Sequence, residues 1–195
     1  MNRWVRLLMW VVARGPAWCD SHLPRALGRR LWLRARHTAL ELYPRRFTRT
    51  INPEGIVFVG NTRDVIQRSI MLHSIWEPDI TQWMRSFVGP GDVVADIGAN
   101  VGYYSLLLSR LVGPQGRVVA AEPVPSIQAE LRERLAANSV GNVEVLDVAL
   151  GPRSGRTEVF RASADNIGNS STIAETGHTS EGQVCVRSAD EVLLE

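Results

Sequence analysis

The stretch that decides the fold covers residues 93–122 and reads VVADIGANVGYYSLLLSRLVGPQGRVVAAE. Its first three residues are apolar and partly β-branched, and so short a run predicts a buried strand that ends at Asp96. A glycine-rich loop follows, and residues 103–112 form a compact apolar helix that ends at Gly113. A second apolar strand at 118–121 ends on Glu122. This order of strand, glycine loop, helix and strand is typical of the opening of an α/β nucleotide-binding unit.

The flanking sequence extends this unit in both directions. Upstream we expect a strand at 56–60 and helices at 64–73 and 79–88. Downstream we expect a helix at 125–138, a third strand at 143–150 and short strands at 157–161 and 184–186. We also expect a polar loop at 164–182. The start of a further helix is expected at 188–194, with Ser188 and Glu191 as a capping box. The alternation of strands and helices predicts a parallel sheet with right-handed crossovers.

Composition limits the class of protein. The chain has 195 residues, of which 45% are hydrophobic and 22% charged, and these values exclude a disordered, collagen-like or coiled-coil protein. Cys19 and Cys185 cannot build a disulfide framework, and they fit free thiols in a reducing compartment. The four histidines lack ligand spacing to one another or to cysteine, so we expect no metal site. These features predict a cytoplasmic protein.

Charge divides the chain into an arm and a body. Residues 1–50 carry eleven arginines against Asp20 and Glu41, a net charge of +9, and residues 51–195 carry −7. Four of the six tryptophans also lie in the arm. We therefore predict a basic helical arm at 1–50, with a helix over 29–42, and a main domain at 51–195 whose cofactor-binding core is 76–151.

Two functions of the arm stay open. The apolar run at 4–13 is shorter than the roughly 20 residues that a membrane-spanning helix needs. One hypothesis is a basic, tryptophan-bearing helix on an anionic membrane surface, which would give peripheral membrane association. The other is a helical cap that docks its apolar side on the main domain and keeps its arginines solvated. We do not expect a nucleic-acid partner, because the sequence contains no recognisable nucleic-acid-binding module.

The loop after the first strand predicts a particular ligand. A dinucleotide fingerprint has the spacing G-x-G-x-x-G, but here Gly98 and Gly102 are separated by three residues, and Asp96 lies two positions before Gly98 at the end of the predicted strand. A carboxylate at this place repels phosphate and favours a cationic group. Glu122, at the end of the next strand, is placed to accept hydrogen bonds from both ribose hydroxyls. A ribose with a positively charged, phosphate-free tail describes S-adenosylmethionine.

The predicted cofactor site combines the loop with the ends of the three strands. Asp147, near the end of the third strand, is placed to meet the adenine amino group, and Tyr103 begins the helix after the loop. The candidate cofactor-binding residues are Asp96, Gly98, Asn100, Gly102, Tyr103, Glu122 and Asp147. The alternative is that these glycines and acids are ordinary turn residues at strand ends. His73 and His178 are possible general bases, but nothing in their spacing marks either, and we name no catalytic residue.

Residues 76–151 resemble the FkbM family of S-adenosylmethionine-dependent methyltransferases. The matching segments are WEP at 76–78, PGD at 90–92, DIGANVGYY at 96–104, AEP at 121–123 and residues 142–151, with a looser match through 166–186. The resemblance implies an α/β, Rossmann-like methyltransferase fold and O-methylation of a sugar or natural-product hydroxyl, with a small molecule or a glycolipid as acceptor. Members of the family continue with a fourth strand and a further acidic motif, so the resemblance also implies a sheet that is incomplete at the C-terminus.

Several functions remain as alternatives. The first is the O-methyltransferase, and the second is a truncated, non-catalytic cofactor-binding remnant that needs a missing second half. A methyltransferase that acts on nucleic acid or protein is a third. A dinucleotide-dependent oxidoreductase is disfavoured by the glycine spacing and by Asp96.

Overall fold

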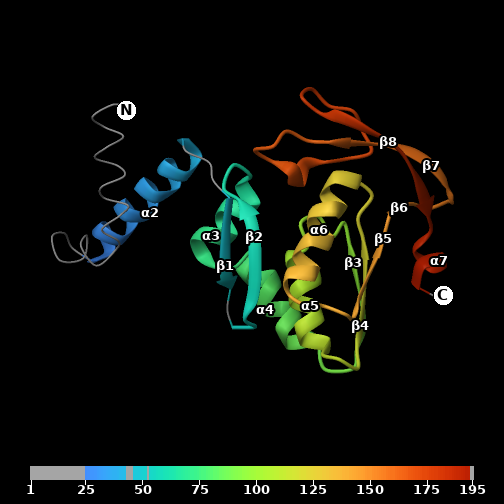
Figure 1. Cartoon of the computed structure of the whole chain (residues 1–195), viewed down its shortest axis with the longest axis horizontal. Coiled ribbons are helices and arrows are strands. Elements are labelled where there is room, and N and C mark those ends of the chain that lie inside the picture. Colours follow the sequence, from blue (N-terminus) through green and yellow to red (C-terminus); the bar gives the residue numbers. More distant parts are fainter. Residues whose placement is uncertain (1–24, 43–45, 52, 194–195) are drawn as a thin grey trace.

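A three-stranded parallel sheet forms the centre of the molecule. The computed structural model describes residues 25–42, 46–51 and 53–193 (Figure 1). The sheet has the order β3-β4-β5, with bounds Val93–Ile97, Arg117–Ala121 and Val143–Leu146. Val93 pairs with Arg117, and Val118 pairs with Val143, both in parallel register. The predicted α/β class with a parallel sheet is confirmed.

Two crossover helices, α5 (Tyr103–Val112) and α6 (Pro125–Ala137), connect these strands and lie on one side of the sheet (Figure 1). The bounds of α5 are those predicted, because glycines stand directly before and after the helix. Leu106 and Leu107 of α5 and Ile127 and Leu131 of α6 are at most 1% exposed. Their burial against the sheet holds the loop between β3 and α5 in a fixed place.

An antiparallel hairpin, β1 (Arg46–Ile51) and β2 (Ile56–Asn61), packs against the outer side of α6. Among the described residues no strand pairs with the second edge of β2, and side chains satisfy polar groups there instead. Asn138 accepts the N–H of Val57 and donates to its carbonyl, both at 2.7 Å, and Arg134 donates to the carbonyl of Val59 at 2.6 Å. Strand β1 crosses residue 50, the predicted boundary between arm and main domain.

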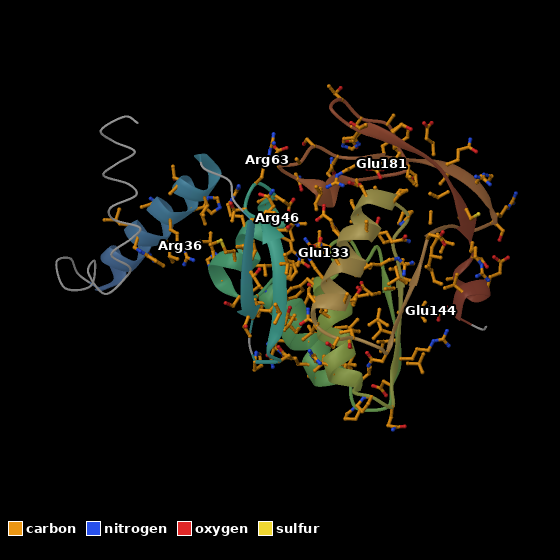
Figure 2. All side chains as sticks on the ribbon, viewed as in Figure 1. Arg36, Arg46, Arg63, Glu133, Glu144 and Glu181 are labelled. Carbon is orange, nitrogen blue, oxygen red and sulfur yellow. The ribbon has the colours of Figure 1, made fainter. Side chains whose placement is uncertain are left out.

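Three further helices complete the amino-terminal part: α2 (Arg25–Leu42), α3 (Val65–His73) and α4 (Pro78–Phe87). Leu40 of α2 is buried against Met71 and Leu72 of α3, which docks the end of the arm on the body. Figure 2 shows Arg36 on α2 and, on β1, Arg46, whose guanidinium lies 3.5 Å from the carboxylate of Glu133. The predicted apolar run at 4–13 lies outside the described residues. None of the described helices is long and apolar enough to cross a membrane.

A second, mixed sheet has the order β6-β8-β7, with bounds Val148–Leu150, Thr179–Arg187 and Gly155–Arg161. Glu181 of β8 accepts the N–H of Ser126 at the start of α6, at 2.8 Å, and thereby joins this sheet to the helix layer (Figure 2). Helix α7 (Ala189–Leu193) follows, and Ser188 and Glu191 exchange the hydrogen bonds of the predicted capping box.

Two predictions about this carboxyl-terminal part are wrong. The single strand expected at 143–150 is interrupted at Asp147, because Leu146 pairs with Ala121 in the first sheet and Val148 pairs with Cys185 in the second. The loop expected at 164–182 contains the 3₁₀ turn η1 (Ile167–Asn169), and β8 already begins at Thr179. Pairing with β7 supplies backbone partners to these polar residues, which the hydrophobic pattern did not mark.

Candidate functional site

A cavity of about 310 Å³ opens at the carboxyl ends of β3 and β4. One side, the glycine-loop wall, is formed by lining residues within 97–100 and 121–124. The opposite side, the second wall, is formed by lining residues within 148–150 and 167–172. Ligands of α/β proteins bind in this position, just outside the carboxyl ends of the parallel strands.

The two glycines of the loop, Gly98 and Gly102, differ in how closely other atoms pack on their backbone. Gly98 and Gly102 have φ values of +76° and +82°, in the left-handed region. A Cβ at Gly102 would lie 2.4 Å from Cδ1 of Leu131, so α6 packs directly on this backbone. A Cβ at Gly98 would have no such neighbour within 4 Å, so the backbone there borders open space. The N–H groups of Gly98 and Ala99 both donate to the carbonyl of Ala121, which fixes the loop on β4.

Glu122 places a buried carboxylate on the cavity surface, where the side chain is only 5% exposed. Its two oxygens accept the N–H groups of Asn100 and Val124, each at 2.9 Å. Burial raises the pKa of this carboxyl, and these two hydrogen bonds oppose the rise. An ionised carboxylate has about four acceptor positions, so Glu122 keeps room for two ligand donors.

Asp96, the other predicted carboxylate, does not line the cavity. Side chains alternate along a strand, and that of Asp96 is buried on the side of α5, where Ser105 donates to it at 2.6 Å. Burial raises the pKa of Asp96, and the hydrogen bonds from Ser105 lower it. Within this structure Asp96 therefore holds the start of α5, and a contact with a cationic ligand stays a prediction.

Asn100 carries a buried acceptor that has no partner. Its backbone has φ +49°, and its side chain lies on the cavity surface between the glycine-loop wall and Gly168. The side-chain oxygen Oδ1 is buried and accepts no hydrogen bond in the described structure. Buried polar atoms of this kind are rare and are unfavourable unless a donor reaches them. Asn100 therefore lines the cavity and carries an unpartnered acceptor, but this oxygen is closed to solvent, and a ligand donor would reach it only after the side chain turns.

Comparisons with known proteins agree with this geometry. The family model "Protein-L-isoaspartate(D-aspartate) O-methyltransferase (PCMT)" matches residues 54–168, more than half of the chain. The chain belongs to the PCMT family. The matched residues include α3, the glycine loop, Glu122 and the start of the second wall. The methyltransferase class predicted from the sequence agrees with this family, whereas the narrower assignment to FkbM is not shown.

The similar proteins align with only part of this PCMT-family chain. A protein-L-isoaspartate O-methyltransferase of Ignicoccus hospitalis is 41% identical over 56 residues, 29% of this chain and 26% of that protein. One of Aeropyrum pernix is 43% identical over 65 residues, 33% of this chain and 24% of that protein. The chain thus matches about a quarter of the length of these relatives. A solved S-adenosylmethionine-dependent methyltransferase of Aquifex aeolicus is 27% identical, with a TM-score of 0.34 over 40% of each chain.

Some of the residues predicted to bind the cofactor line the cavity of this PCMT-family chain, and others do not. Of the seven candidates, Gly98, Asn100 and Glu122 line it. The hydroxyl of Tyr103 lies 3.2 Å from Oγ1 of Thr81, behind the loop. Asp147 is exposed at the break between β5 and β6 and is not part of the lining. The assignment of the seven residues to a cofactor stays a prediction.

Sequence reasoning missed the second wall. Ser170 accepts the N–H of Ala162 at 3.0 Å and donates to the carbonyl of Ile167 at 2.7 Å, so the segment is ordered by its own hydrogen bonds. The signal in the sequence was weak: Ile167 and Ile173 are the two isoleucines of a polar stretch, and Ile167 is 2% exposed whereas Ile173 is 68% exposed. The looser part of the family resemblance, which began at residue 166, was the better indication.

Neither predicted general base lies in the cavity lining. His73 is exposed at the end of α3, and Nε2 of His178 lies 3.8 Å from the carboxylate of Glu175. Among the lining residues that the structure describes, Glu122 is the one titratable side chain. No group of three potential metal ligands comes together within the described parts of the chain.

Proposed function

We propose that the chain binds S-adenosylmethionine in the 310 Å³ cavity and forms the cofactor-binding part of a methyltransferase of the PCMT family. The observation that carries this proposal is the Glu122 carboxylate on the cavity lining, which keeps room for two ligand donors beside the glycine loop. S-adenosylmethionine offers matching donors in its ribose hydroxyls and its ammonium group. The spacing of the loop glycines disfavours a dinucleotide.

The chain's own residues hold and enclose this ligand. Glu122 would accept from the ribose hydroxyls, and the open backbone at Gly98 allows close approach. Apolar side chains of the second wall, Val148 and Ile167, exclude water from the opposite side. When bound, S-adenosylmethionine supplies a methyl group made electrophilic by its sulfonium. Positioning of an acceptor in line with that group can supply much of the rate.

The acceptor is an oxygen, and we propose a carboxylate of a protein rather than the predicted sugar or natural-product hydroxyl. A carboxylate is already ionised at neutral pH, whereas a hydroxyl must lose its proton to a general base within hydrogen-bond reach. The described lining contains no histidine, cysteine or tyrosine, and both oxygens of Glu122 are held by backbone N–H groups. The names of the family and of the two relatives favour the same acceptor class.

Calorimetric titration of the full chain with S-adenosylmethionine tests the cofactor. We expect saturable binding at one site, weakened by Glu122→Gln, and an absence of binding would contradict the proposal. Transfer of labelled methyl from the cofactor then tests the acceptor, with an isoaspartyl peptide, the matched aspartyl peptide and a hydroxyl-bearing sugar. Transfer to the sugar alone would favour the hydroxyl. Binding without transfer to any of the three would favour the non-catalytic cofactor-binding remnant.

We propose separately that the arm makes peripheral contact with an anionic membrane from the cytoplasmic side. Arg30 and Arg34 of α2 are exposed, and Leu31 between them is 44% exposed, whereas Ala39 and Leu40 dock on the body. The carboxyl-terminal end of α2 is thus docked on the body, while the part that carries Arg30 and Arg34 is basic and faces solvent. Co-sedimentation with anionic liposomes at low salt should be lost in R30E/R34E and with neutral lipid. Full-length protein that stays in the supernatant would contradict the proposal.

A further inference from the structure

We infer that Asp64, which lies before α3 and outside the cavity, is a positioning residue that holds the second wall against the glycine loop. The inference rests on the proposed function, because it assigns Asp64 to S-adenosylmethionine binding through the place of that wall. It concerns a residue outside the predicted cofactor core at 76–151.

Asp64 joins two parts of the chain that are far apart in sequence. Its side chain is 2% exposed, and its Oδ1 accepts the N–H of Gln67 at 2.9 Å as the N-cap of α3. Its other oxygen, Oδ2, accepts the N–H of Ile167 at 3.0 Å, across 103 positions. The N–H of Val65 donates to the carbonyl of Asp165 at 2.9 Å and strengthens the same junction. The start of α3 is therefore hydrogen-bonded directly to the segment that lines the cavity.

The segment beyond this junction is held between α3 and the glycine loop. A Cβ at Gly168 would lie 2.5 Å from Cδ1 of Ile66 on α3 and 3.5 Å from Nδ2 of Asn100 on the loop. Ile167 and Gly168 both line the cavity. The distance between the two walls at this point is consequently set by where Asp64 places the backbone of Ile167.

The residue type at position 64 supports a role beyond helix capping. Asn and Ser cap helices about as well as Asp and bring no buried charge. A buried carboxylate is unfavourable unless its oxygens accept hydrogen bonds, and here burial raises the pKa of Asp64. An aspartate offers two acceptor oxygens for two separate N–H groups, and the structure uses one for α3 and one for the second wall.

The decisive variant is Asp64→Asn in the full chain. Its one amide oxygen still caps α3, while its NH₂ group cannot accept the N–H of Ile167. We expect the dissociation constant of S-adenosylmethionine to rise roughly tenfold, the scale of one charge-assisted hydrogen bond. We also expect faster amide hydrogen exchange at Ile167 and Gly168. Asn138→Ala is the matched control: it removes the contacts with Val57 on the far side of α6, and should lower the melting temperature without changing the dissociation constant.

A second variant keeps the test decisive if Asp64→Asn fails to fold. Asp64→Ser also keeps a capping oxygen for α3, but it has one oxygen in place of two and should weaken binding in the same direction. Wild-type dissociation constants and exchange rates in both variants would overturn the inference alone. If the wild-type chain binds no S-adenosylmethionine, the proposed function fails, and the exchange rates at Ile167 in ligand-free Asp64→Asn then decide whether Asp64 holds the wall.

Discussion

The two walls of the cavity are built by different means. The glycine-loop wall comes from adjacent turns of one β-α-β unit, and backbone hydrogen bonds from Gly98 and Ala99 to Ala121 fix it. The second wall comes from β6 and from residues 167–172, and a side chain 103 positions away holds it. The first wall is therefore stable wherever the unit folds, whereas the second depends on the packing of the whole chain. Substitutions in the two walls should accordingly differ in size and in kind.

The largest expected effect is on the stability of the glycine-loop wall, from Gly102→Ala. The substitution forces a left-handed backbone on alanine and places Cβ 2.4 Å from Cδ1 of Leu131. We expect the free energy of unfolding to fall by roughly 2–4 kcal/mol, measured by chemical denaturation. Gly141→Ala is the control, because its Cβ meets no atom within 4 Å, and it should change stability by less than about 0.5 kcal/mol. Equal losses in the two variants would contradict the close packing at Gly102.

The next effect is on ligand binding, from Glu122→Gln in the same wall. The amide keeps the shape of the carboxylate but loses its charge and one of its two acceptor oxygens, which weakens its bonds to ribose hydroxyls. We expect the dissociation constant of S-adenosylmethionine to rise roughly 10- to 100-fold in calorimetry. A constant within twofold of wild type would remove Glu122 from the site.

A smaller effect is expected in the second wall, from Gly168→Ala. Its Cβ would meet the flexible end of Ile66, at 2.5 Å, rather than backbone. We expect a loss of about 1 kcal/mol in the free energy of unfolding, because the side chain can give way. Ile66→Val deletes the methyl group concerned, so the double variant should recover part of the loss in a double-mutant cycle. Strict additivity of the two substitutions would show that the wall does not contact α3 there.

The smallest effect is a pH dependence that comes from Asp96. Burial raises its pKa in the folded chain above the ordinary value of 3.8, so the folded state holds this proton more tightly than the unfolded state. The contribution of Asp96 to stability is therefore largest at low pH and declines as pH rises through the unfolded and then the folded pKa. We expect the stability of wild type relative to Asp96→Asn to fall as the pH rises above the ordinary pKa of 3.8. A rise in this relative stability would contradict the direction of the shift.

The sequence contained much of the glycine-loop wall and little of the second. Helix α5 was bounded correctly because glycine stands at both its ends, and Glu122 was identified because it ends a buried strand. Asp96 was predicted to end the neighbouring strand, but β3 runs on to Ile97, and the pleat of the strand turns the side chain of Asp96 toward α5. The break at Asp147 could not be predicted, because β8, some 35 positions later, provides the partner of Val148. The same holds for Ile167, whose place depends on Asp64.

The side-chain amide of Asn138 also ties the hairpin to a part of the chain that is distant in sequence. It takes the place of a neighbouring strand beside Val57, across 81 positions. Native contacts between residues so far apart in sequence are the kind that slow folding. We expect Asn138→Ala to uncover this edge of the hairpin, so that the backbone amide of Val57 exchanges faster with solvent.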